Sequence, residues 1–133
     1  MKVEDTKSLR ACIVVNLGLD SSGIIDLLGS FQIVPEVFNS YEEALGKQKE
    51  HPFEILIVHD DPLTGQGLKL IEEFLKINWM TSAILICDQD ESIVHDRAEG
   101  LGILGHVANV NDLDSLSKLL TKFKQISPLY SSV

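Results

Sequence analysis

The 133-residue sequence predicts a doubly wound α/β fold, in which a five-stranded parallel sheet is covered by helices on both faces. Two observations lead to this prediction. Apolar runs of strand length recur along the chain with little polar alternation, as in strands that are buried on both faces. These runs alternate with segments that have helical spacing, and the connection rules for parallel strands then favour a doubly wound arrangement.

The first apolar run, ACIVVNL at residues 11–17, predicts a central strand. A short helix is expected next, because Asp20, Ser21 and Ser22 are cap-forming residues that precede apolar residues at helical spacing. This helix should end near Gly29.

The next strand is expected to begin at Pro35 and to lie at an edge of the sheet, because proline cannot donate a ladder hydrogen bond. Ser40 is followed three residues later by Glu43, which is a capping-box pattern. The pattern predicts a helix over 41–50 that closes before Pro52.

The second half of the chain repeats the strand and helix pattern three times. Apolar runs predict strands over 53–59, 82–88 and 101–107, and glycines weaken the last of these. Helical spacing predicts helices over 67–77, 91–100 and 111–126, with Asn111 or Asp112 as the cap of the last helix.

Composition favours one domain over 1–133, with tails at 1–9 and 127–133, and excludes several classes of function. The formal net charge of −9 and the scattered basic residues argue against binding to nucleic acid. The polar N-terminus does not resemble a signal peptide, and no apolar run is long enough to span a membrane, so we expect a soluble cytoplasmic protein without membrane contact. Cys12 and Cys87 lie inside strand-like runs, which predicts buried thiols rather than a disulfide.

Functional loops of doubly wound sheets lie at the carboxyl ends of the strands, here at 16–20, 59–66, 87–90 and 107–111. One of these begins with His59, Asp60 and Asp61 directly after a buried strand. Imidazole and carboxylates together can bind a divalent metal. Adjacent strand residues point to opposite sides, however, which favours a simple loop in which Asp60 or Asp61 caps a turn.

A loop with proline and glycine after the third strand, followed by the pair Gly67 and Leu68, resembles the receiver domain of bacterial two-component response regulators, the CheY-like family. The resemblance covers nearly the whole chain. It implies a flavodoxin-like sheet with the strand order 2-1-3-4-5. In that family an Asp eight residues before the glycine accepts a phosphoryl group. Counting back from Gly67 places His59 at this position, whereas a loop one residue shorter would place Asp60 there, and both alternatives stay open.

The other positions to which the resemblance points lack the chemistry of the family. Two acids hold Mg²⁺ at the end of the first strand in the family, and Asn16 and Leu17 stand there in this sequence. Cys87 replaces a hydroxyl residue, and a thiol is a poor hydrogen-bond donor to phosphate. Val107 stands where the family has a lysine. Phosphoryl transfer depends on positive charge near the transferring oxygens, so the resemblance implies a degenerate receiver that is not phosphorylated.

We therefore expect a signalling module, not an enzyme, that acts by protein–protein contact without a cofactor or a bound metal. The expected partner is a sensor kinase, an effector or a second copy of the chain. In the family, the face made by the fourth helix, fifth strand and fifth helix serves such contacts. The matching residues here are Ile93, Val94, Leu104 and 113–120, unless they belong to the core.

Two alternatives remain open at this stage. The chain is either an atypical receiver that is phosphorylated on Asp60, or a small α/β ligand-binding or enzymatic domain with His59 as a general base in the strand-end crevice. The loop after the first strand has neither the dinucleotide-binding nor the P-loop spacing, which counts against the second alternative.

Overall fold

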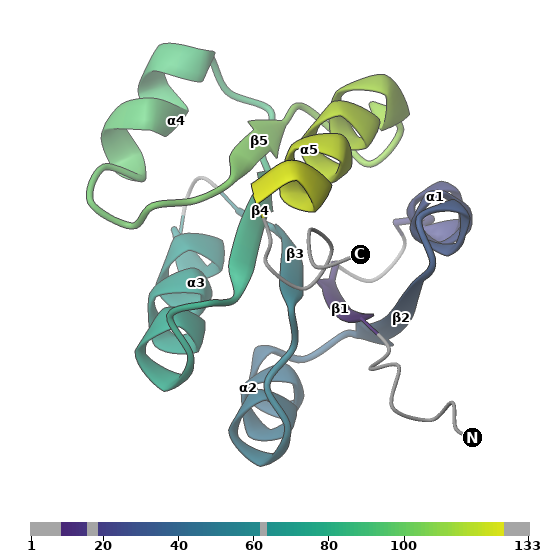
Figure 1. Cartoon of the computed structure of the whole chain (residues 1–133). Helices are drawn as coiled ribbons and strands as arrows, with labels where there is room; N and C mark the ends of the chain where they lie inside the picture. The colour runs from purple at the N-terminus through teal and green to yellow at the C-terminus, as the bar shows by residue number, and fades with distance from the viewer. Residues whose placement is uncertain (1–8, 16–18, 62–63, 127–133) are drawn as a thin grey trace, which may run out of the picture.

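A computed structural model of the chain describes residues 9–15, 19–61 and 64–126. Five strands alternate with five helices in this part of the chain (Figure 1). They are β1 (Leu9–Val14), α1 (Ser22–Ser30), β2 (Ile33–Phe38), α2 (Tyr41–Glu50), β3 (Ile55–His59), α3 (Gln66–Ile77), β4 (Ser82–Ile86), α4 (Glu91–Arg97), β5 (Gly105–Val107) and α5 (Leu113–Ile126). The strands form one parallel sheet in the order β2-β1-β3-β4-β5, which confirms the predicted fold class and strand order.

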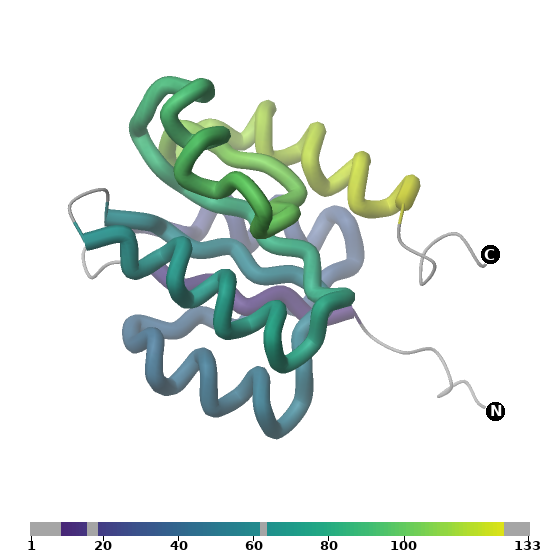
Figure 2. The backbone as a smooth tube through the Cα atoms, turned by 90° about the vertical axis from the view of Figure 1, so that its left-hand side faces the viewer, coloured from purple at the N-terminus to yellow at the C-terminus, as the bar shows by residue number. Residues whose placement is uncertain are grey.

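The sheet separates two hydrophobic clusters, one under each layer of helices. Helices α1 and α5 cover one face, and α2, α3 and α4 cover the other (Figure 1). In the side view of Figure 2, α5 lies on the opposite side of the strands from α2 and α3. The central strands are buried on both faces, as their continuous apolar runs predict.

Local hydrogen bonds fix the starts of several helices. The Ser40 hydroxyl accepts from the backbone N–H of Glu43 at 3.2 Å, which confirms the predicted cap of α2. Before α1, the Asp20 carboxylate accepts from the N–H of Ser22 at 2.9 Å. Before α5, the Asp112 carboxylate accepts from the N–H of Ser115 at 3.4 Å.

The strand boundaries differ from the prediction. Strand β3 begins two residues later than predicted and β4 ends two residues earlier. Strand β1 begins at Leu9 because this buried side chain pairs in register with Ile33 and packs in the core, and β2 therefore begins before Pro35. Strand β5 is only three residues long, since the loop before it turns through Gly100 and Gly102 at positive φ. Residues 16–17, which we expected to end the first strand, lie outside the described residues.

Several burial predictions can be compared directly with the structure. Cys12 and Cys87 are free and buried, as predicted. The surface expected to bind partners is mostly core, because Val94 and Leu104 are buried, as are Leu116 and Leu120 of α5, while Ile93 is exposed. Among the described residues, no helix has both the length and the apolar character needed to cross a membrane.

Candidate functional site

The site lies at the carboxyl ends of β3 and β4, where each strand continues by one residue. The N–H of Asp60 donates to the carbonyl of Ile86 at 2.9 Å, and the N–H of Cys87 donates to the carbonyl of Val107 at 2.9 Å. Asp60 and Cys87 therefore stand at the same level on neighbouring strands.

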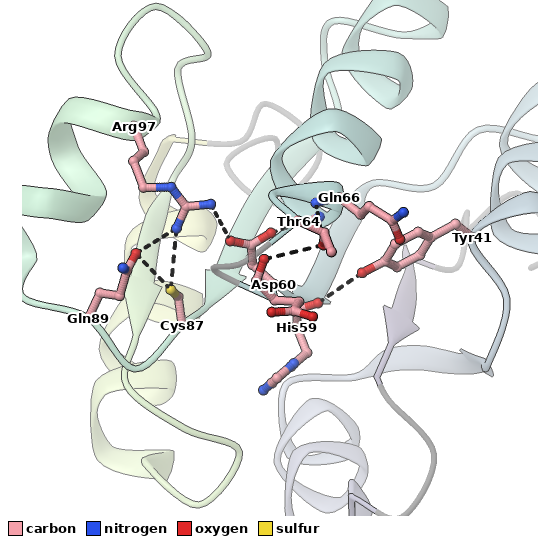
Figure 3. Close-up of polar contacts among 10 residues, drawn as sticks. Tyr41, His59, Asp60, Thr64, Gln66, Cys87, Gln89 and Arg97 are labelled. Atoms are coloured by element: carbon pink, nitrogen blue, oxygen red, sulfur yellow. Dashed lines mark hydrogen bonds and ion pairs between the residues drawn. The ribbon is translucent and has the colours of Figure 1, made fainter.

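His59 and Asp60 point to opposite faces of the sheet, as successive strand residues must. Asp60 is on the same face as Val58, which packs with helices α2, α3 and α4. The imidazole of His59 points away from the carboxylate of Asp60 (Figure 3). The two residues therefore do not form one metal-binding or acid–base pair.

Asp60 is buried, with a relative exposure of 1%, and both of its carboxylate oxygens have partners. Oδ1 accepts from the backbone N–H of Gly67 at 2.8 Å, at the start of α3. Oδ2 accepts from Nη2 of Arg97 at 2.6 Å (Figure 3). A buried carboxylate thus has a guanidinium as its counter-ion, which is the usual requirement for burying a charge.

Arg97 is the last residue of α4 and reaches back across the strand ends. Its Nη1 donates to the side-chain carbonyl of Gln89 at 2.6 Å and lies 3.7 Å from the sulfur of Cys87. Partial burial lowers the pKa of Arg97, but the hydrogen bond and the negative charge of Asp60 outweigh this effect, and the pKa is raised overall. Arg97 is therefore a permanent cation inside the site.

Cys87 is held as a neutral thiol next to this ion pair. Burial raises the pKa of Cys87, and the charge of Asp60 raises it further, although Arg97 acts in the opposite direction. The thiolate is the nucleophilic form of cysteine, so this environment disfavours a reactive thiol.

Two glycines make room for the ion pair. A Cβ atom on Gly67 would lie 2.7 Å from Oδ1 and 2.8 Å from Cα of Asp60. Gly65 precedes α3 at a φ of +66°, a conformation that favours glycine, and the guanidinium of Arg97 lies close to it. The sequence GQG at 65–67 is thus explained by the close approach of Asp60 and by a left-handed turn.

A separate hollow of about 320 Å³ also lies at the carboxyl ends of the strands. Its lining consists of Val14, Val15, Asn39, Tyr41, Asp61, Thr64 and Gln66, so it includes Asp61 but neither His59 nor Asp60. The Tyr41 hydroxyl donates to the carbonyl of His59 at 3.2 Å (Figure 3). Burial and, to a lesser extent, the charges of Asp60 and Asp61 raise the pKa of Tyr41, which keeps the phenol neutral.

The structure places five of the predicted site residues at the carboxyl ends of the strands. They are His59, Asp60, Asp61, Cys87 and Val107, whereas Asn16 and Leu17 lie outside the described residues. Val107 is buried and contributes its backbone carbonyl to the ladder.

The sequence reasoning missed Arg97 as the cation of the site. An arginine at the end of a short helix was its only sequence signal, and spacing does not reveal a contact with a residue 37 positions away.

The donor set does not fit the Mg²⁺ ion of receiver domains. Mg²⁺ needs carboxylate oxygens that are free to coordinate it. Oδ2 of Asp60 already contacts a guanidinium, which would repel a second cation. Within the described ranges, no group of three or more His, Cys, Asp or Glu side chains is arranged to hold a metal ion.

Comparison with known proteins gives structural matches only. No protein-family model matches the sequence, and no curated protein matches it. A two-component response regulator from Clostridium difficile superimposes with a TM-score of 0.72 at 13% identity, over 90% of this chain and 98% of that chain. The non-phosphorylated HemR receiver domain from Leptospira biflexa gives 0.71 at 16% identity, over 86% and 92%. The response regulator domain of Thermotoga maritima CheB gives 0.69 at 15% identity, over 90% and 96%. The chain therefore has the fold of response regulator receiver domains.

Proposed function

We propose that this chain is a receiver-like signalling module that works by binding other proteins and is not phosphorylated. The likeness to the three response regulator domains supports the first part, since it extends over at least 86% of the chain. By the same likeness, the expected partner is a signalling protein such as a sensor kinase or an effector.

The ion pair between Asp60 and Arg97 is the single observation that carries the second part. A carboxylate that attacks phosphorus must present an oxygen to the phosphodonor. Asp60 is 1% exposed, and each of its oxygens already accepts a hydrogen bond. A donor could reach Asp60 only if Arg97 moved away.

The sequence at the positions to which the resemblance points supports this proposal. Asn16 and Leu17 stand where the resemblance puts the metal-binding acids, and Val107 stands where it puts a lysine. Phosphoryl transfer relies on a metal and a cation placed against the transferring oxygens. The sequence therefore lacks the metal-binding acids and the lysine of the family at these positions, and the cation next to Asp60 is Arg97, which already pairs with its carboxylate.

Phosphorylation on Asp60 is the second candidate, because the guanidinium of Arg97 lies next to the carboxylate that would carry the phosphoryl group. A guanidinium suits phosphoryl oxygens because its fork of N–H donors matches them. In this version Arg97 leaves Oδ2 of Asp60 and pairs with the phosphoryl group, so it replaces the lysine of the family.

Treatment with acetyl phosphate and Mg²⁺, followed by intact-mass measurement, separates the two candidates. We expect no gain in mass. In a parallel titration with beryllofluoride followed by NMR, we expect no saturable change in the amide chemical shifts of Thr64 and residues 87–90. A gain of one phosphoryl group that disappears in Asp60→Asn would overturn the proposal and establish the second candidate.

A further inference from the structure

A larger hollow lies at the opposite end of the sheet, where β3, β4 and β5 begin. Its volume is about 620 Å³. We name it the Trp79 groove; it is lined by Phe53, Glu54, Asn78, Trp79, Met80, Thr81, Ser82, Gly102, Ile103, Leu104, Lys122, Phe123 and Ile126. The groove is thus made by the residues before β3, the loop before β4, the loop before β5 and the last turns of α5.

The groove exposes large apolar side chains that the core does not use. Trp79 is 80% exposed, Met80 is 55% exposed and Ile126 is 59% exposed. Tryptophan and methionine are enriched in protein interfaces, and tryptophan is the residue most often found at their energetic centre. An exposed apolar group beside a hollow is therefore typical of a binding surface.

The turn that presents Trp79 and Met80 is fixed by hydrogen bonds. The Asn78 side chain accepts from the N–H of Met80 at 3.1 Å, and the Asn78 carbonyl accepts from the N–H of Thr81 at 3.1 Å. The Thr81 hydroxyl in turn donates to the carbonyl of Phe53 at 2.7 Å. Because the turn is already ordered, a partner would not bear the entropic cost of ordering it.

The groove also has an asymmetric charge. Glu54 also lines the groove, and its Oε1 accepts from the N–H of Arg10 at 2.6 Å. The Lys122 ammonium makes one long hydrogen bond, 3.5 Å to the carbonyl of Leu104, and it forms no ion pair within the part of the chain that the structure describes. An ammonium has three donors, so Lys122 can bind a carboxylate at the wall of the groove.

We propose that the Trp79 groove binds a short segment of a partner protein that places a large apolar side chain against Trp79 and Met80 and a carboxylate against Lys122. The net charge of −9 by itself would favour a basic partner. A preference for acidic segments would therefore come from Lys122 and not from the overall field. The proposal is independent of the chemistry of Asp60, which lies at the other end of the sheet.

Selection of short random peptides on the immobilised chain tests this proposal. Trp79 is the only tryptophan in the sequence, so its emission reports on the groove when the selected peptides are synthesised and titrated. We expect the selection to enrich peptides that combine an aromatic or Leu residue with a neighbouring Asp or Glu. We also expect the tryptophan emission to shift to shorter wavelength when such a peptide binds.

Variants at Lys122 and Trp79 make the test specific. Lys122→Glu should lower the affinity for the selected peptides by about five- to tenfold. Lys118→Glu, at an exposed lysine on the same helix outside the groove, should leave the affinity unchanged. Trp79→Ala should abolish binding of the labelled peptide in fluorescence anisotropy.

Three outcomes would overturn the proposal. The first is a selected pool that does not depend on Trp79. The second is a pool of basic peptides whose affinity is unaffected by Lys122→Glu. The third is a concentration-dependent emission shift without peptide, with dimers in sedimentation, because the occupant would then be a second copy of the chain. A positive phosphorylation test at Asp60 would leave the proposal intact.

Discussion

Replacing Arg97 by Met should destabilise the domain more than replacing Asp60 by Asn, although both changes break the same ion pair. The Asp60 side chain is fully buried, whereas the Arg97 side chain is 22% exposed. Without Arg97, a buried carboxylate keeps only its bond from Gly67. Removal of one partner from a buried pair costs about 3–5 kcal/mol, and unit charges about 4 Å apart at an effective dielectric constant near 20 interact by about 4 kcal/mol.

The Asp60→Asn variant has a smaller expected cost. Its amide oxygen can still accept from the N–H of Gly67, and the partly exposed guanidinium of Arg97 can turn towards water. We expect a loss of about 1.5–3 kcal/mol, the range for a hydrogen bond to a charged group. In the double variant no buried charge remains unpaired, so it should be more stable than Arg97→Met alone.

Urea unfolding at neutral pH, followed by far-ultraviolet circular dichroism, measures these free energies. The unmodified chain, Arg97→Met, Asp60→Asn and the double variant form a double-mutant cycle that isolates the interaction between the two side chains. Lys76→Met is the matched control, because Lys76 makes an exposed ion pair with Glu73 and should cost less than about 0.5 kcal/mol.

The reasoning fails if Arg97→Met costs no more than Lys76→Met. Arg97 would then not hold Asp60 in solution, and the argument that Asp60 is unavailable as a nucleophile would lose its basis. It also fails if the double variant is less stable than Arg97→Met, because the carboxylate of Asp60 would then not be the buried charge that needs Arg97.

The remaining predictions concern packing, capping and the thiol. Gly67→Ala should cost about 1–3 kcal/mol in thermal unfolding because the new Cβ would press on the backbone of Asp60. Gly46→Ala should stabilise by up to about 1 kcal/mol, since its Cβ would meet nothing within 4 Å in α2. Ser40→Ala should lower the free energy of unfolding by about 1 kcal/mol through loss of the cap, and an unchanged value would refute the role of that hydrogen bond. Cys87 should resist iodoacetamide until the chain unfolds. Folding raises the pKa of this thiol above 9.0, so its contribution to the free energy of unfolding is present below about pH 9 and is lost as the pH rises further. The decrease in the free energy of unfolding at alkaline pH should therefore be smaller in Cys87→Ala.

The fold could be predicted because each central strand is buried on both faces. A strand such as Ile55–His59 must then be apolar at consecutive positions, which leaves an unambiguous pattern in the sequence. The cap at Ser40 was equally readable, because its partner is only three residues away. Strand β2 was less readable, because Ile33 and Val34 pair with β1 although a proline follows them.

The candidate site was predictable only in part, since its contacts are distant in sequence. Position after a buried strand marked Asp60 as a candidate. The pairing of Asp60 with Arg97 depends on the distance between the end of α4 and the sheet, and on the length of the arginine side chain. No local sequence pattern encodes this contact. In the sequence, Gly67 indicates only the register of the loop, whereas in the structure its N–H also donates to the carboxylate of Asp60.

The two edges of the sheet have a consequence for aggregation. An open edge strand is a template on which another chain can add a strand. Here β5 is only three residues long, and β2 carries Pro35, which has no N–H to offer. Although Val34 and Val37 of β2 are exposed, an incoming strand would find an interrupted row of donors there. We therefore expect the domain to resist edge-to-edge polymerisation at high local concentration, so that its encounters with other molecules depend on side chains and not on the backbone of the sheet.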